Sequence, residues 1–295
     1  MSKIILFGAS GQQGGAIAKK LKSAGHRIVA PVRSTKNEAD LHQKEIETRL
    51  TDFSTASLTP IIKEGDQVVL QVPAVITPSE MIAFAENALK AIANAGSPHT
   101  VFNISSIIPK EFIGLEGPDA RLTLKNLSTQ LAPHTIVLSS TLYLENFSQA
   151  YRQAIEQGGV IPQAIPNDTP VAYLSLDDLA AFVLAALEKP HLRGKFIPIG
   201  GSEVLNGMQL AEKIGNVVDK SIYYQAITPQ DLAIFLTPMI GETTALQVAE
   251  MYSWEGTLGS SLLNPNVAQA QEILDVSLPS FEEWAIRAFS NSDNQ

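Results

Sequence analysis

The stretch Lys3-Ile-Ile-Leu-Phe-Gly-Ala-Ser-Gly-Gln-Gln-Gly-Gly15 decides the fold of this chain. The apolar run from Ile4 to Phe7 predicts a strand, and Gly8, Gly11 and Gly14 follow at three-residue spacing. Apolar residues at helical spacing come directly after the glycines. A strand, a tight turn and a helix in this order are typical of a dinucleotide-binding loop.

The chemistry of such a loop explains its residue types. Glycine permits the sharp turn, lets backbone N–H groups approach a pyrophosphate and lets the helix pack closely on the strand. The anionic phosphates then lie at the helix N-terminus, where the helix dipole and unpaired N–H groups favour negative charge. A tight turn without a ligand is the alternative. We expect a cofactor to be bound by Gly8, Ser10, Gly11, Gln12, Gln13 and Gly14.

Composition excludes several classes of protein. The chain has 295 residues, 45% of them hydrophobic and 17% charged, which predicts two globular domains or one enlarged α/β domain. A formal net charge of −9 disfavours binding to nucleic acid. With no cysteine, disulfides and thiolate nucleophiles are excluded, and the five histidines show no metal-ligand spacing, so we expect no metal site. We expect a cytoplasmic location, because neither a membrane span nor a signal peptide is evident.

The second predicted strand, residues 26–33, indicates which cofactor is bound. NAD sites place an acid about 20 residues beyond the glycines, whereas NADP sites offer arginine to the 2′-phosphate. This chain has Arg33, Ser34, Thr35 and Lys36 there, with no acid before Glu38. The pattern therefore favours NADP(H) with Arg33 on the 2′-phosphate. The alternative is that Arg33 is an ordinary surface charge.

Further strands are predicted at residues 45–50, 66–73, 100–106 and 135–139, with helices between them. This alternation predicts a doubly wound parallel sheet whose ligands bind beyond the carboxyl ends of the strands. Asp52 and Phe53 would then border the adenine, and Ser105 would point toward the nicotinamide. Gln71, Val72 and Pro73 would lie along the cofactor. A turn or helix N-cap is an equal interpretation for Asp52.

The character of the chain changes after Thr141, where prolines punctuate an extended region and helices are predicted at 206–218, 229–236, 242–254 and 280–289. We therefore predict an NADP-binding Rossmann domain over residues 1–150, with its sheet completed by about 171–200. Residues 151–170 and 201–295 would form a smaller, mostly helical substrate-binding part.

The chain resembles the NmrA-like branch of the atypical short-chain dehydrogenase/reductases over nearly its whole length. The resemblance rests on Gly8–Gly15, Arg33, Asp52, Ile104-Ser105-Ser106, Glu145-Asn146-Phe147, Leu174–Leu179, Lys195–Gly201 and Phe281-Glu-Glu-Trp284. It implies a Rossmann fold, a preference for NADP(H), binding by the Gly8 loop and Arg33, and a substrate cleft between the two parts.

Catalytic residues are harder to assign. Ordinary short-chain dehydrogenases use Tyr-x-x-x-Lys after the fifth strand, but no tyrosine lies between Ser106 and Ser140. Arg121 and Lys125 are one helical turn apart, near the place where related reductases carry a lysine, and either could hold the ribose or polarise a carbonyl. An exposed basic helix face is the alternative. Tyr143 could approach a substrate or be part of the core.

Two functions follow from this pattern. The first is an NADPH-dependent reductase of a small quinone or conjugated carbonyl compound, in which the proton comes from solvent. The second is a non-catalytic NmrA-type redox sensor that binds NADP(H) and regulates a protein partner. A structural scaffold with a relic glycine loop is a third alternative. The expected partner of the reductase is a small-molecule substrate, with neither nucleic acid nor membrane involved.

Overall fold

A computed structural model describes residues 1–73, 77–257 and 259–290, except for the side chain of residue 37. Its contacts divide the chain into two compact units. The first unit contains Met1–Ser140, Leu176–Ile199 and Gln269–Val276, and the second contains the rest of the described chain. This division differs from the predicted domains, since the first unit ends at Ser140 rather than at residue 150 and also includes a segment near the C-terminus.

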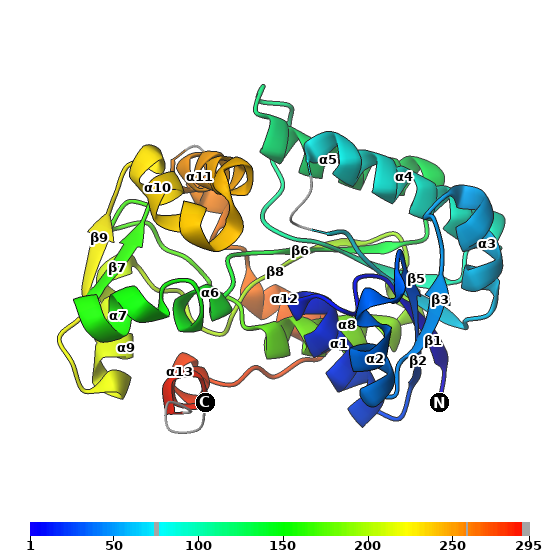
Figure 1. The fold of residues 1–295 in the computed structure, drawn as a ribbon, viewed down its shortest axis with the longest axis horizontal. Helices are drawn as coiled ribbons and strands as arrows, with labels where there is room; N and C mark the ends of the chain where they lie inside the picture. The colour runs from blue at the N-terminus through cyan, green and yellow to red at the C-terminus, as the bar shows by residue number, and fades with distance from the viewer. Residues whose placement is uncertain (74–76, 258, 291–295) are drawn as a thin grey trace. The chain divides into compact units, whose positions relative to one another are not determined.

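The first unit is built on a parallel sheet, and the described residues contribute seven strands to it in the order β3-β2-β1-β4-β5-β6-β8 (Figure 1). This is the doubly wound order of a Rossmann fold, extended by β8 at one edge. The register places Ile5 beside both Val29 and Val68. The strands are β1 (Lys3–Leu6), β2 (Arg27–Val32), β3 (Glu47–Leu50), β4 (Gln67–Gln71), β5 (His99–Ile104), β6 (Ile136–Ser140) and β8 (Phe196–Ile199).

Helices cover both faces of this sheet. On one face α1 (Gln12–Ser23) packs against α8 (Leu176–Leu187), and on the other α4 (Pro78–Asn94) packs between α3 (Thr55–Lys63) and α5 (Glu116–Leu131) (Figure 1). The two remaining helical stretches between β2 and β3 are a 3-10 turn (Thr35–Asn37) and α2 (Glu38–Gln43), which the sequence analysis did not predict. Another 3-10 turn (Pro190–Leu192) precedes β8.

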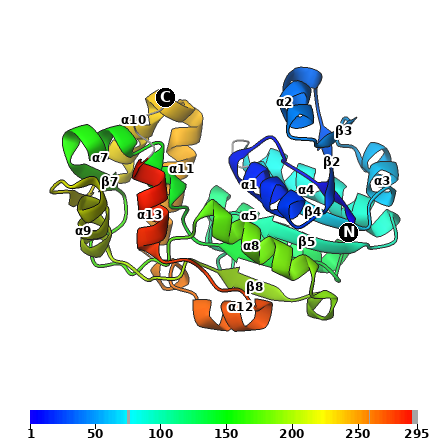
Figure 2. The ribbon, with the colours of Figure 1, turned by 90° about the horizontal axis from the view of Figure 1, so that it is seen from below.

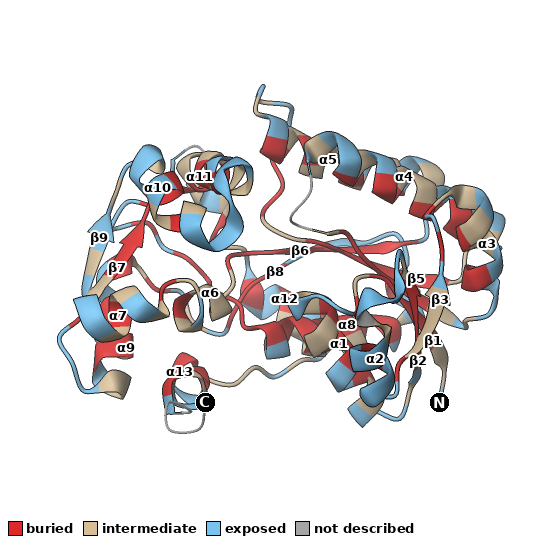
Figure 3. Cartoon of the chain, viewed as in Figure 1, coloured by how far each residue is buried: buried red, intermediate tan, exposed pale blue. Residues whose placement is uncertain are grey.

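The central strands are buried on both faces, as a parallel sheet between two helical layers requires (Figure 3). All six residues of β5 are buried, among them the polar side chain of Asn103, which is 0% exposed. A polar side chain in such a strand needs hydrogen-bond partners at once, because burying an unpaired amide is costly. Those partners lie at the edge of the sheet formed by the carboxyl ends of its strands.

The second unit is mostly helical, as predicted, but it also contains a two-stranded parallel sheet of β7 (Val160–Gln163) and β9 (Tyr223–Ala226) that was not predicted. Its α13 (Phe281–Phe289) lies alongside α9 (Gly207–Val218) (Figure 2). The other elements after β6 are α6 (Glu145–Ser148), α7 (Arg152–Gly158), α10 (Pro229–Ile240), α11 (Glu242–Gly256), a 3-10 turn (Ser260–Leu262) and α12 (Val267–Leu274).

Candidate functional site

The glycine loop turns the chain from β1 directly into α1. Gly8 has a φ of +73°, a conformation that favours glycine, and its carbonyl accepts a hydrogen bond of 2.9 Å from the N–H of Gly11. A Cβ on Gly14 would lie 2.1 Å from the Gly8 oxygen, so the close approach of helix and loop requires glycine there. Gly11 is exposed, and a Cβ there would approach only the Gly8 oxygen, at 3.4 Å.

Helix α1 presents its N-terminus without a side-chain cap. Its N-cap is Gly11, and its first turn holds no acidic residue. By contrast, α3 and α4 are capped by the hydroxyls of Ser54 and Thr77. The N-terminal N–H groups of α1 and its dipole therefore favour an external anion, which is the property that a phosphate-binding loop needs.

Four polar side chains form a hydrogen-bonded network beside this helix. Asn103 donates from Nδ2 to Gln71 Oε1 at 2.8 Å and to Gln13 Oε1 at 3.3 Å. The hydroxyl of Ser105 donates to Gln13 Oε1 at 2.7 Å. The network thus joins the first turn of α1 to the carboxyl ends of β4 and β5, and it brings together three of the predicted cofactor residues.

Arg33 follows β2 and lies over an aromatic ring. Its guanidinium carbon is 5.3 Å from the centroid of the Phe53 ring. Glu80 lies in the first turn of α4. Hydrogen bonds from Thr77 lower the pKa of Glu80, and the positive charge of Arg33 lowers that pKa further. Arg33 itself is exposed at this end of the sheet, where a ligand can reach it.

Phe53 is held in an unusual backbone conformation, with a φ of +61°. A bulky side chain in this region is strained by about 1–3 kcal/mol and needs compensation from its surroundings. Phe53 is only 8% exposed, and its ring centroid lies 5.0 Å from that of Phe84 and 6.3 Å from that of Phe7. Burial in this aromatic cluster holds in place the ring over which Arg33 lies.

Asp52 shapes the turn that carries Phe53. Its Oδ1 accepts hydrogen bonds from the N–H of Ser54, at 2.9 Å, and from the hydroxyl of Ser57. These bonds lower the pKa of Asp52 to about 2, the one from Ser57 having the largest effect. The contacts are those of a turn residue, which was the second interpretation of Asp52. Contact with the adenine remains a prediction.

The carboxyl end of β4 supplies the remaining predicted cofactor residues. Gln71 and Val72 are buried, and Pro73 is half-buried. The amide of Gln71 is 3.4 Å from the carbonyl oxygen of Val72, to which it donates. Ser10 and Gln12 are exposed in the glycine loop.

The two basic candidates on α5 are both engaged within the first unit. Arg121 donates to the carbonyl oxygens of Ser105, at 3.0 Å, and Gly117, at 2.8 Å. It thereby fastens the end of β5, where Ser106 adopts a φ of +74°. The ammonium of Lys125 lies 4.2 Å from the ring centroid of Phe196 on β8. The structure therefore gives both residues contacts with the fold, and their contacts with a substrate remain predictions.

Tyr143 belongs to the second unit, where it is half-buried and pairs with Leu174 in an isolated parallel bridge. The interior of that unit holds a cluster of four other tyrosines. Tyr173 and Tyr224 donate to Gln163 Oε1, at 3.2 and 3.3 Å. Burial raises the pKa of both phenols, so they stay protonated at neutral pH. The other two members are Tyr151 and Tyr252.

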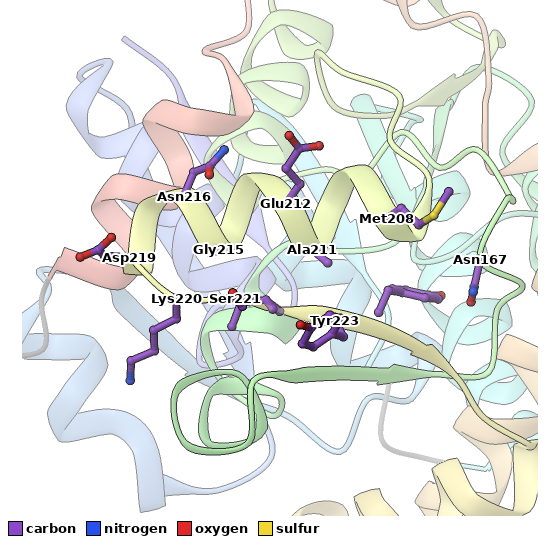
Figure 4. Close-up of a pocket in the computed structure, with 12 residues that line it drawn as sticks. Asn167, Met208, Ala211, Glu212, Gly215, Asn216, Asp219, Lys220, Ser221 and Tyr223 are labelled. Carbon is purple, nitrogen blue, oxygen red and sulfur yellow. The ribbon is translucent and has the colours of Figure 1, made fainter.

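The surface of the second unit carries a groove of about 820 Å³ between α9 and β9 (Figure 4). Glu212 and Asp219 line it together with Lys220, and the exposed side chains of Met208 and Tyr223 add apolar surface. No sequence motif pointed to this groove.

Two other features are absent from the described ranges. No helix within them has both the length and the apolar character needed to cross a membrane. Nor do three or more His, Asp or Glu side chains from these ranges gather in an arrangement suited to a metal ion.

Sequence reasoning missed Asn103, which connects two of the predicted residues. A signal was present, because an amide interrupts the otherwise apolar run Val101-Phe102-Asn103-Ile104. A polar residue in the middle of a strand that is buried on both faces is informative, since such strands are built mainly from apolar side chains.

The chain is similar in sequence or in fold to several known proteins. Agroclavine dehydrogenase of Claviceps fusiformis is 26% identical over 300 residues, which cover 99% of this chain and 97% of that protein. An NADPH-dependent quinone oxidoreductase of Escherichia coli, crystallised with NADPH, has a TM-score of 0.79 at 21% identity, covering 97% of this chain and 99% of the other. The negative transcriptional regulator NmrA, crystallised with NADP, has a TM-score of 0.74 at 16% identity, covering 98% and 95%. At these identities the solved structures establish a shared fold.

The family assignment rests on a separate match. The sequence pattern of the NmrA-like family matches residues 1–285, which include the glycine loop, the polar network and Arg33. The chain therefore belongs to the NmrA-like family.

Proposed function

We propose that the first unit binds NADP(H) and that the protein is an NADPH-dependent reductase of a small quinone or conjugated carbonyl compound. The observation that carries the cofactor assignment is the position of Arg33, which lies at the end of β2 over the Phe53 ring. An NAD site would have an acid there to accept from the ribose hydroxyl, whereas a guanidinium matches a 2′-phosphate in charge and geometry.

The residues of the first unit fit the rest of the cofactor. The uncapped N-terminus of α1 offers N–H donors and a positive dipole end to a pyrophosphate. Exposed Gly11 leaves room for its approach, and Gly14 keeps the helix close to the loop. At the ends of β4 and β5, the amide of Gln71 and the hydroxyl of Ser105 would lie beside the nicotinamide half of the cofactor.

When bound, the cofactor would supply the hydride, and the protein would provide binding, orientation and electrostatics. Arg33 and the α1 N-terminus would fix the two anionic groups, while the network around Asn103 would hold Gln13 and Ser105 in place. A quinone or conjugated carbonyl can take its proton from solvent, which accounts for a site without the Tyr-x-x-x-Lys motif. The name of the quinone oxidoreductase with the same fold supports this acceptor class for that protein and suggests it here.

The second candidate is a redox sensor that binds NADP(H) without turnover and reports to a protein partner. Two observations favour it. Arg121 and Lys125 both contact other parts of the first unit. No tyrosine lies between Ser106 and Ser140, where ordinary short-chain dehydrogenases carry the Tyr-x-x-x-Lys motif. The fold of the regulator NmrA, crystallised with NADP, is compatible with it.

Isothermal titration with NADPH, NADP+, NADH and NAD+, followed by a panel of quinones and enals, separates these functions. Tight binding of NADPH with acceptor-dependent oxidation supports the reductase. Tight binding of NADPH and NADP+ with no oxidation across the panel supports the sensor. If none of the four nucleotides binds, both functions are wrong.

A further inference from the structure

We propose that the groove between α9 and β9 binds an extended, basic segment of a partner protein, which adds to β9 as a further strand. The groove lies in the second unit, whereas the residues proposed to bind NADP(H) all lie in the first. The inference therefore goes beyond the proposed function and concerns a surface of the second unit alone.

Strand β9 has one paired edge and one open edge. Among the described strands it pairs with β7 alone. The N–H groups of Tyr223 and Ile227 donate to carbonyl oxygens on the β7 side, each at 2.9 Å. Successive N–H groups of a strand point to opposite edges, so those of Tyr224 and Ala226 point to the edge that no described strand occupies. Such an edge is a template for another strand.

The groove adjoins this open edge. Residues of β9 line it, whereas β7, on the paired side, contributes none of its lining. On the α9 side, Ala211 and Gly215 line it with little side-chain volume. A Cβ on Gly215 would lie 2.6 Å from the carbonyl oxygen of Lys220, so helix and strand approach closely at that end. Small residues on the helix thus leave space beside the strand.

The spacing of the larger side chains on α9 suits an extended chain. Met208, Glu212 and Asn216 line the groove and follow one another along the helix at intervals of four residues (Figure 4). Four helical residues rise by about 6 Å, and two residues of an extended chain span about 6.6 Å. A strand lying along α9 would therefore bring every second side chain to one of these three residues.

The charges of the groove specify a basic occupant. Glu212 and Asp219 are exposed, and neither forms an ion pair with another described residue. Lys220 also lines the groove, but its ammonium donates to the carbonyl oxygen of Glu156 at 2.8 Å and points away from α9 (Figure 4). The two carboxylates are therefore available to lysine or arginine side chains of a partner.

Apolar surface adds to this attraction. The side chains of Met208 and Tyr223 are 62% and 71% exposed, and both line the groove. Covering them with apolar side chains of the partner would remove that surface from water. The groove thus offers apolar contacts, negative charge and an open strand edge, and an extended peptide with basic and apolar residues satisfies all three.

Two other occupants match less of the groove. A second copy that paired β9 with β9 about a two-fold axis would bring the carboxylates of both copies together, in a chain whose formal net charge is already −9. A small cation would match the carboxylates but would leave the strand edge unpaired.

The probe is the capped, fluorescein-labelled peptide Leu-Thr-Lys-Thr-Lys-Thr-Leu, titrated with the full chain at low ionic strength and read as fluorescence polarisation. Its symmetric sequence places leucine and lysine on one face in either chain direction. We expect saturable binding, and binding at least tenfold weaker when glutamate replaces both lysines. N-methylation of every second residue removes the N–H groups of one peptide edge. Of the two N-methylated versions, one should lose binding and the other should keep it.

Three variants of the protein test the same contacts from the other side. Glu212→Lys should weaken the lysine peptide at least fivefold and strengthen the glutamate peptide. Glu272→Lys, on the exposed side of α12 and outside the groove, makes the same charge change and should alter neither. Ala226→Pro removes one N–H from the open edge, where proline is tolerated, and should weaken the lysine peptide. Circular dichroism verifies that each variant is folded.

Four results overturn the inference. They are no binding of the lysine peptide, equal binding of the lysine and glutamate peptides, equal affinities of both N-methylated versions and the unmodified peptide, and equal effects of Glu212→Lys and Glu272→Lys. If no peptide binds and the protein self-associates in a way that Ala226→Pro abolishes, the occupant is a second copy and the inference is wrong. Glu212→Lys should bind NADPH as the unsubstituted protein does, so the titration that tests the proposed function is decided separately.

Discussion

The guanidinium of Arg33 lies over the ring of Phe53, 5.3 Å from its centroid, and the two residues come from different turns of the chain. Arg33 follows β2, whereas Phe53 follows β3 and takes up a strained positive φ. Stacking restricts the arginine side chain without using any of its N–H donors, so the guanidinium remains able to bind a phosphate. The arrangement preorganises the cation at the edge of the sheet.

Arg33→Glu tests the cofactor preference that this contact implies. The substitution should weaken NADPH by about 2 kcal/mol or more while sparing NADH, because the change removes a charge-assisted bond to the 2′-phosphate and adds repulsion. Titration calorimetry with both nucleotides measures it. Arg27→Glu, at the opposite end of β2, is the matched control and should alter neither affinity. Equal losses for both cofactors would refute the 2′-phosphate assignment.

Gly14→Ala and Gly11→Ala should behave differently although both change the same loop. The new Cβ at position 14 would lie 2.1 Å from a backbone oxygen, so we expect a loss of more than about 3 kcal/mol in the free energy of unfolding. At position 11 the nearest atom is 3.4 Å away, so the loss should stay within about 1 kcal/mol while NADPH binding falls. Urea denaturation and titration measure the two effects. If Gly11→Ala binds NADPH normally, the pyrophosphate does not pass over this glycine.

Asp52→Ala should lower the melting temperature at neutral pH but not in strong acid. The carboxylate is stabilised in the folded state, where its pKa is about 2 against an ordinary value of 3.8. The stabilisation is therefore complete above about pH 4 and is lost as the pH falls through about 2. Thermal melts of the variant and the unsubstituted protein across this range check the expectation, with Asp40→Ala on the exposed side of α2 as a control. A difference that stays constant down to pH 2 would contradict the turn role of Asp52.

Tyr151→Phe and Tyr224→Phe form a matched pair in the interior of the second unit. The Tyr151 hydroxyl is buried near Gln163 and Tyr252, but among the described residues it makes no hydrogen bond of good geometry, so removing it should leave the free energy of unfolding unchanged or raise it by up to about 1 kcal/mol. Tyr224 donates to the carbonyl oxygen of Ile165 at 2.9 Å, so its loss should cost about 1 kcal/mol. Chemical denaturation decides; a large loss for Tyr151→Phe would show that its hydroxyl has a partner.

Arg121→Met and Lys125→Met distinguish a structural from a catalytic role on α5. Arg121 holds the backbone at Ser105, so its loss should cost about 1–3 kcal/mol in stability and raise the KM for NADPH. Lys125 contacts the Phe196 ring, an interaction worth about 0.5–1 kcal/mol at such a site, and its loss should leave kcat within about twofold. Steady-state kinetics and denaturation measure both. A collapse of kcat in Lys125→Met would restore Lys125 as the catalytic residue.

Much of the first unit was predictable, because its signals are local. The apolar runs and glycines around Gly8 predicted the first strand, turn and helix, and the alternation of strands and helices predicted the parallel sheet. The second unit was harder: β7 contains Pro162, and β9 is largely exposed, so neither shows a strand pattern. Their pairing joins Val160 to Tyr223, which are far apart in the chain.

What the sequence by itself determined is the set of groups at the ligand-binding edge. The loop glycines, Arg33 in place of an acid, and the absence of tyrosine between Ser106 and Ser140 are properties of residue type and spacing. Only the tertiary structure decided how these groups are held, because the contacts of Asn103 with Gln13 and of Arg33 with Phe53 join separate elements. The direction of an amide and the orientation of a guanidinium depend on neighbours that local sequence patterns do not specify.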